Sequence, residues 1–311
     1  FVPSSERTRL GTVGFQAVRL TLPQETVAFF NLKNSALAVK EVRQALALAV
    51  NRQEVVEAQQ RASEAVWGPY PFDAATGTPP DLERARTLLT AAGWVLPLNG
   101  SIRIWKPIAK KTTVSAKPKR KKSKKAEPPA PIALPATTST ELTLTITVPE
   151  EPELLAVADT LKRAWSLLGA KVLVEALPTK ELVRRATRDR TTQIVLLNVL
   201  LGPDQDISSF WWSAQAVDRG LNFSNLRDRA IDDALDRVQS ATATEMLPAL
   251  RAAASAAILN AAPAVFLTRP SLHYLVSDKI HGVPNALICA TPAERFQTIH
   301  RWYRKTGWRW R

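Results

Sequence analysis

Two carboxylates and three large aromatic rings are the side chains of this sequence whose types and spacing best suit chemistry. They fall in the stretch LLGPDQDISSFWWS and are Asp204, Asp206, Phe210, Trp211 and Trp212. Three interpretations are open: a solvated turn, because Asp and Pro favour turns, a catalytic acid/base or metal-binding pair, or a ligand pocket. In a pocket, indole rings lower the dielectric around a carboxylate, which then pairs strongly with an ammonium group such as a peptide's amino terminus.

The rest of the sequence offers little support for an enzymatic or metal-binding role. The three histidines, His273, His281 and His300, are far apart, and a single cysteine, Cys289, excludes a cysteine-rich zinc site. The sequence contains no G-x-S-x-G elbow, no Walker loop and no G-x-G-x-x-G turn. We therefore expect a binding protein and not an enzyme, with no catalytic residue, no metal ligand and no cofactor.

The acidic pair directly follows TQIVLLNVLLG, residues 192–202, which is apolar on both faces as a central strand should be. Upstream, the alternating strand 141–149, the amphipathic helix 152–169, the strand 171–177 and the short helix 180–190 complete a β-α-β-α-β order. This order predicts a largely parallel sheet with helices on its faces. Because ligands bind beyond the carboxyl ends of such strands, the acidic stretch is predicted to line a site.

Further elements flank this unit. Residues 18–34 contain two extended runs, and helices are predicted after them, with Asn51 and Asp81 as N-caps and Gly93 as a stop. Towards the carboxyl end, we expect helices and then two closing strands in the ranges 229–241, 245–262, 264–270 and 273–277.

Most of the net charge of +14 comes from one segment. Residues 106–127 hold nine Lys and one Arg against one Glu, a net charge of +9, which leaves +5 for the rest. With the Pro-rich stretch that follows, residues 108–140 are too polar to bury an apolar face, and we expect a disordered insertion. A solvated basic loop or a contact with an anionic surface are both open interpretations. The Trp- and Arg-rich tail leaves a polyanion-binding interpretation open too.

Four stretches together resemble the family 5 extracellular solute-binding proteins, the oligopeptide and dipeptide receptors of ABC importers. They are FFNLKNSALAVKEVRQALALAVNRQEVV, DLERARTLLTAAGW, LLGPDQDISSFWWSAQ and GLNFSNLRDRAIDDALDRVQSAT. The residues that match the first two family patterns are Asn31, Val42, Arg43, Ala45, Leu46, Arg52, Ala85, Leu88, Leu89, Ala92, Gly93 and Trp94, whereas Asn51 replaces the usual Asp. The resemblance covers the later part of the family's chain.

The resemblance implies an α/β fold, a periplasmic-binding-protein-like (type II) lobe with a mixed, largely parallel sheet, plus the disordered Lys/Pro-rich insertion. It also implies a division of the chain: hinge-proximal strands, a first part of the lobe, the insertion, a second part of the lobe, and a return to the other lobe, at 1–26, 27–107, 108–140, 141–275 and 276–311. The other lobe, with its signal peptide and lipid-anchoring cysteine, is expected to lie outside this sequence.

For function, the resemblance implies a substrate-binding component that holds a peptide by lobe closure and delivers it to ABC permease subunits. Such a protein is extracytoplasmic, in the periplasm or on the outer face of the membrane, and is often a lipoprotein. The predicted ligand contacts are Asp204, Asp206, Phe210, Trp211, Trp212 and Asn222; in the family loop D-Y-x-D-P the first acid falls near Pro203, and Asp206 matches the second. Residues 106–125 are expected to contact an anionic membrane or wall, and no nucleic-acid partner is expected. The alternative is a polyanion- or nucleic-acid-binding module that uses the Lys-rich segment and the tail.

Overall fold

The computed structural model describes residues 14–59, 63–70, 77–106, 141–202, 204–284, 286–289 and 291–305. Within these residues, one large mixed sheet runs in the order β11–β1–β9–β2–β8–β6–β7, with β3 paired to β9. The predicted α/β class with a mixed sheet is confirmed. The Lys/Pro-rich segment 108–140 lies outside the described residues.

Parallel pairing is concentrated in the strands that follow residue 140. Strand β6 (Thr143–Pro149) pairs in parallel with β7 (Lys171–Leu177) and with β8 (Ile194–Leu200). Strand β2 (Gln24–Phe30) joins this group through an antiparallel ladder with β8. Strand β8 lies inside the sheet, between β2 and β6. Its side chains are largely apolar on both faces because both faces of a central strand are covered, as the sequence predicted.

Strand β9 (Ala264–Ser277) is one continuous strand, so the prediction of two separate closing strands was wrong. Its first half pairs with β2, its second half pairs with β1 (Phe15–Thr21), and both ladders are antiparallel. Pro270 lies between the two ladders, opposite Ser63 of β3 (Ser63–Ala65), where a missing backbone N–H costs little. Pro270, which suggested a break between two strands, instead marks the point where β9 changes its pairing partner from β2 to β1.

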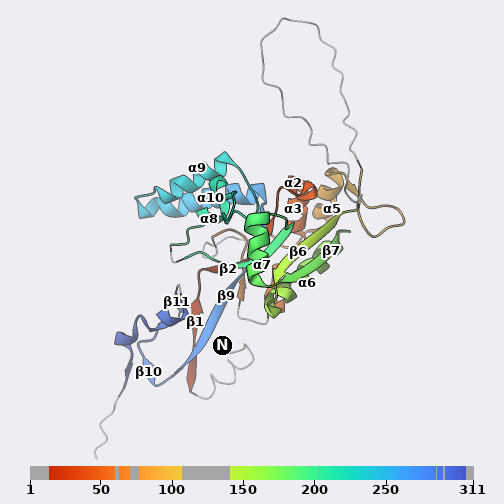
Figure 1. Cartoon of the computed structure of the whole chain (residues 1–311). Coiled ribbons are helices and arrows are strands. Elements are labelled where there is room, and N and C mark those ends of the chain that lie inside the picture. Colours follow the sequence, from red (N-terminus) through yellow and green to blue (C-terminus); the bar gives the residue numbers. More distant parts are fainter. Residues whose placement is uncertain are drawn as a thin grey trace, which may run out of the picture.

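Helices cover the two faces of the sheet. The first set is α2 (Ser35–Ala38), α3 (Lys40–Leu48), α4 (Arg52–Ala58), α5 (Leu82–Ala91) and α6 (Pro152–Ser166). The second set is α7 (Thr179–Arg184) with the π-turn Arg185–Asp189, α8 (Ser208–Trp211), α9 (Arg229–Gln239) and α10 (Leu247–Ala261). Figure 1 shows α8, α9 and α10 grouped on one side and α2, α3 and α5 on the other. No helix among the described residues is long and apolar enough to cross a membrane.

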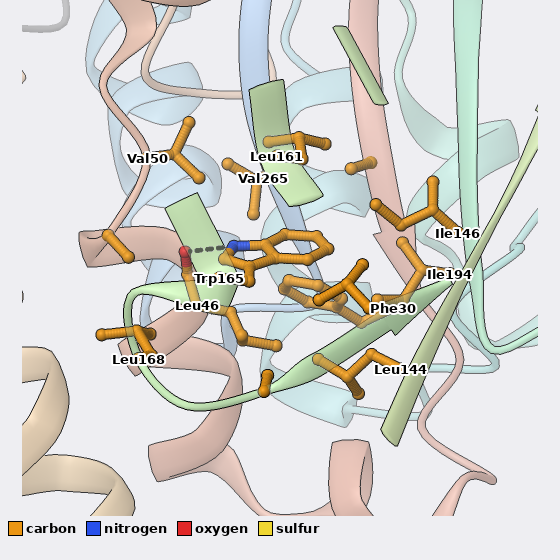
Figure 2. Close-up of a cluster of buried hydrophobic side chains, with 14 of the residues drawn as sticks. Phe30, Leu46, Val50, Leu144, Ile146, Leu161, Trp165, Leu168, Ile194 and Val265 are labelled. Atoms are coloured by element: carbon orange, nitrogen blue, oxygen red, sulfur yellow. Dashed lines mark hydrogen bonds between the residues drawn. The ribbon is translucent and has the colours of Figure 1, made fainter. Parts of the chain in front are cut away.

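Successive side chains of β2 point to opposite faces of the sheet and so contribute to both hydrophobic cores. Ala28 and Phe30 enter the core under the first helix set, whereas Val27 and Phe29 enter the core under the second. In the first core, shown in Figure 2, Phe30 lies against the fully buried Trp165 of α6 with ring centroids 6.1 Å apart. The two cores make a three-layer α/β/α unit.

Helix ends follow the predicted signals. The side chain of Asn51 accepts the backbone N–H of Gln53 at the start of α4, and Asp81 does the same for Arg84 at the start of α5. Gly93, with φ of 91°, follows the end of α5 in the left-handed region that favours glycine. The predicted caps at Asn51, Asp81 and Gly93 are confirmed.

The smaller elements are two short sheets, the short edge strand β11 of the large sheet, and several 3₁₀ turns. They are β4 (Trp94–Val95) with β5 (Ile104–Trp105), β10 (Ile280–His281) with β12 (Tyr303–Arg304), β11 (Ala286–Ile288), and 3₁₀ turns at Ser213–Gln215, Thr244–Met246, Pro292–Phe296 and Ile299–Arg301. Strand β1 and the second half of β9 form a ribbon that extends away from the helices (Figure 1). The carboxyl-terminal elements gather along this ribbon.

Candidate ligand-binding site

The acidic loop emerges from the carboxyl end of β8, as predicted. The backbone N–H of Leu201 donates to the carbonyl oxygen of Pro23 at 2.8 Å, which fixes the start of the loop next to the β1–β2 turn. The backbone then turns sharply, with φ of 71° at Gly202 and 56° at Gln205. A glutamine in the left-handed region is strained, and such strain is concentrated at functional sites. Asp204 is exposed in this turn.

Asp206 lies at the start of helix α8 and is exposed. Its Oδ1 accepts the backbone N–H of Ser208 at 2.9 Å, and the side-chain amide of Gln239 lies 3.4 Å from its carboxylate oxygens. Arg251 of α10 donates to the carbonyl oxygen of Asp204 at 2.9 Å. The two acids therefore shape their own turn and keep their carboxylates accessible, so the turn and the binding interpretations are compatible.

Phe210 and Trp211 serve the second core. Both are buried, and the ring of Phe29 lies 6.2 Å from Phe210 and 5.4 Å from Trp211, centroid to centroid. Trp211 also contacts Phe266 of β9. Trp212 is only partly buried at the margin of this cluster. Of the three aromatic rings, Trp212 is the one with surface left for a ligand.

Asn222 is completely buried, and both polar atoms of its side chain are hydrogen-bonded. Its Nδ2 donates to the carbonyl oxygens of Trp212 at 3.0 Å and Leu226 at 2.9 Å, and its Oδ1 accepts the N–H of Leu226 at 3.2 Å. Asn222 thus holds the backbone of Trp212 at the end of α8, whereas Asp206 lies at the start of this helix. Direct ligand contact by the six predicted residues stays a prediction; Asp204, Asp206 and Trp212 are its accessible members.

Several residues that organise this site carry no signal in the sequence. Gln239 and Arg251 brace the acidic loop from α9 and α10, and Arg190 binds the loop that follows Trp212. Arg190 adopts a left-handed conformation with φ of 49°. Nothing in the residue types distinguishes Arg190 from the neighbouring arginines Arg184, Arg185 and Arg188, so only the backbone path reveals its role.

A separate hollow lies on the ribbon formed by β1 and β9. It has a volume of about 610 Å³, and its largely apolar lining includes Leu20, Leu22, Pro270, Phe296 and Trp302. None of the six predicted ligand contacts lines it. Among the described residues, no group of three or more His, Cys, Asp or Glu side chains is placed to hold a metal ion.

The chain matches the family model described as "Bacterial extracellular solute-binding proteins, family 5 Middle" over residues 21–220. The chain belongs to this family. The match includes the acidic loop, α8 and Trp212, so the resemblance to family 5 is confirmed. Comparison with curated protein sequences finds no match.

Solved structures of binding proteins share the fold of this chain. The oligopeptide-binding protein AppA from Bacillus subtilis, solved with a nonapeptide, has 16% identity and a TM-score of 0.67 over 96% of this chain and 55% of that one. NikZ from Campylobacter jejuni, solved with Ni(L-His), has 16% identity and a TM-score of 0.68 over 97% and 56%. AppA from Clostridium difficile, a putative peptide-binding protein in its own description, has 15% identity and a TM-score of 0.70 over 98% and 56%. This family 5 chain therefore spans little more than half the length of these proteins.

Proposed function

We propose that this family 5 chain forms most of one lobe of an extracytoplasmic substrate-binding protein that captures peptides for an ABC importer. The observation that carries the proposal is the match to the family model across residues 21–220, which include the exposed acids of the β8–α8 loop. Asp204 and Asp206 offer carboxylates for the peptide's amino terminus, and the exposed part of Trp212 offers an apolar wall. Phe210, Trp211 and Asn222 support that wall from below.

A second lobe is part of the proposal. The solved proteins are almost twice as long as the stretch that this chain covers. The apolar hollow on the β1–β9 ribbon and the exposed rings of Phe15, Phe296 and Tyr303 provide a surface that a further lobe would cover. Residues 1–26 and 276–311 would then join the two lobes, and closure of the lobes would bury a peptide between them. Hydrogen bonds to the peptide backbone would supply affinity, and water-filled pockets would accommodate varied side chains.

The remaining parts of the proposal concern partners. Family 5 proteins that serve ABC importers deliver their cargo to permease subunits, and we assign the same partner here. The peptide is preferred over a chelated metal as the cargo because the exposed carboxylates of Asp204 and Asp206 and the partly exposed indole of Trp212 are groups that suit an ammonium group. We also assign residues 106–125, because of their charge, to contact with an anionic membrane or wall surface. Membrane anchoring would come from a lipoprotein segment outside this sequence.

The test is a titration of the complete protein with a mixed pool of di- to pentapeptides, free and N-acetylated, followed by tryptophan fluorescence. Binding of the free pool, with an affinity at least about tenfold weaker for the acetylated pool, is expected because acetylation removes the ammonium charge. Asp204→Asn and Asp206→Asn should weaken binding of free peptides and reduce the difference between the two pools. Asp159→Asn, at an exposed acid on α6, is the matched control and should change nothing. No response at millimolar peptide would overturn the proposal, and binding of heparin in its place would favour the polyanion alternative.

A further inference from the structure

The guanidinium group of Arg190 is the centre of the loop that follows Trp212. Its donors reach five acceptors in residues 215–225: the carbonyl oxygens of Gln215 at 3.3 Å, Val217, Gly220 at 3.0 Å and Asn222 at 2.7 Å, and the side-chain oxygen of Asn225 at 3.1 Å. A planar guanidinium presents five N–H donors in a fixed fork, which no other side chain reproduces. The loop is therefore folded around one cation.

The backbone of Arg190 is itself tied to the sheet. Asn31, directly after β2 and 5% exposed, donates its side-chain amide to the carbonyl oxygens of Arg190 at 3.2 Å and Thr192 at 2.7 Å. The side-chain oxygen of Asn31 accepts from Asn225 at 2.9 Å. Because Arg190 and its loop share this anchor, the loop is held in a fixed position relative to β2.

Two routes lead from Arg190 to Trp212. Through the first, Arg190 holds the carbonyl oxygen of Asn222, whose side chain donates to the carbonyl oxygen of Trp212 at 3.0 Å. Through the second, Arg190 holds the carbonyl oxygen of Gln215, whose N–H donates to the same oxygen of Trp212 at 3.0 Å. Both hydrogen bonds at the Trp212 carbonyl thus come from residues that Arg190 fixes.

The loop has no room to shift without breaking these bonds. A Cβ atom added to Gly220 would overlap the carbonyl oxygen of Gln215, so the two segments pass each other at backbone contact distance. The same oxygen of Gln215 accepts the N–H of Asn222 at 3.3 Å. We therefore expect a substitution at Arg190 or at Gly220 to shift the backbone of Trp212, which precedes this loop.

We propose that Arg190 is a positioning residue that sets the orientation of the Trp212 indole at the ligand-binding surface. The inference rests on the proposed function only where it assigns a ligand to Trp212; the relay from Arg190 to Trp212 is independent of it. Arg190 touches no ligand in this scheme and acts through Asn222 and Gln215. Substitution by Lys retains the positive charge and loses the fork.

The test compares Arg190→Lys with Arg43→Lys in the complete protein. Arg43 is the matched control because it also donates to four backbone carbonyls, those of Leu37, Ala38, Ala261 and Ala262, and none of these belongs to Trp212 or to residues 215–225. The proteins are labelled with 5-fluorotryptophan, and the ¹⁹F resonance of Trp212 is assigned with Trp212→Phe. We expect the Trp212 resonance to move in R190K and to stay in R43K, although both variants lower the midpoint of thermal unfolding.

Peptide affinity supplies the second readout. R190K is expected to weaken binding of the free peptide pool about tenfold, a loss on the scale of one well-placed contact, whereas R43K stays within about twofold. An unchanged Trp212 resonance in R190K, or an equal displacement in R43K, would overturn the proposal. If R190K does not fold, Gly220→Ala perturbs the same loop from its other side and must displace the Trp212 resonance. If the wild-type protein binds no peptide, the proposed function fails while the resonance still decides the role of Arg190.

Discussion

The indole N–H of Trp165 donates a hydrogen bond to the carbonyl oxygen of Leu46, 2.9 Å away (Figure 2). Leu46 precedes the Lys/Pro-rich segment 108–140 in the chain, and Trp165 follows it. The surrounding core mixes residues from both sides of this segment, such as Val50 and Leu89 from before it and Leu144 and Leu161 from after it. Residues on the two sides of this segment therefore share one hydrophobic core, and we expect them to unfold as one unit.

Replacement of Trp165 should reveal this unit. Trp165→Phe removes the donor and leaves the buried Leu46 carbonyl without it, which costs about 1–3 kcal/mol of unfolding free energy. Trp165→Ala opens a cavity as well and should cost about 3–5 kcal/mol. Urea denaturation measures both. Trp105→Phe is the control because Trp105 is 37% exposed, and it should change stability by less than about 0.5 kcal/mol. Equal losses for the Phe variants of Trp165 and Trp105 would contradict the shared core.

Deletion of residues 108–140 should leave the fold intact. The described ends of the segment already lie together, since Ile104 bridges to Glu141 and the N–H of Leu142 donates to the carbonyl oxygen of Arg103 at 2.8 Å. A short Gly/Ser linker closes this gap, and shortening a loop changes its closure entropy by only about 0.6 kcal/mol per halving. We expect the midpoint of thermal unfolding to stay within about 3 °C, measured by circular dichroism.

The same deletion separates the two function classes. Peptide binding should persist without residues 108–140, and association with anionic vesicles should fall, because a net charge of +9 in residues 106–127 is mostly removed. A scrambled segment of equal composition is the control, and it should restore vesicle association. Loss of peptide binding together with vesicle binding would instead favour the polyanion-binding alternative.

Local chemistry explains why much of the fold was predictable. The N-caps Asn51 and Asp81 and the apolar stripe of α6 depend on neighbours a few residues away in the chain, so the sequence displays them directly. The continuity of β9 depends on which strands flank Pro270, and this is tertiary information. A tryptophan or phenylalanine suits a core and a pocket equally well; only the position of Phe29 shows that Phe210 and Trp211 face a core. The role of Arg190 is equally non-local, because its acceptors lie 25 to 35 positions along the chain.

Glu25 provides a buried acid whose ionisation is opposed by the fold. It is 1% exposed in β2, and one of its carboxylate oxygens has no hydrogen-bond partner within the described residues. Burial raises the pKa of Glu25 well above its ordinary value of 4.5, and the charges of Arg269 and Arg52 offset this only in part. Glu64 on the neighbouring β3 is the opposite case: burial pushes its pKa up, but hydrogen bonds from Arg269 and Arg19 bring the pKa below 4.5.

The pH dependence of stability should therefore differ in sign between Glu25→Gln and Glu64→Gln. Below pH 4.5, Glu25 is protonated in both the folded and the unfolded chain, and wild type and E25Q should respond alike to pH. As pH rises above 4.5, the unfolded chain releases this proton first, so the wild type loses stability relative to E25Q until the raised folded pKa is passed. For Glu64, whose folded pKa is lowered, the wild-type advantage over E64Q is present above 4.5 and is lost as pH falls. Urea unfolding between about pH 3 and pH 8 covers both windows, with the Glu64 difference read below pH 4.5 and the Glu25 difference read above it. A wild-type minus E25Q difference that stays flat or rises above pH 4.5 would show that Glu25 is ionised without penalty inside the sheet.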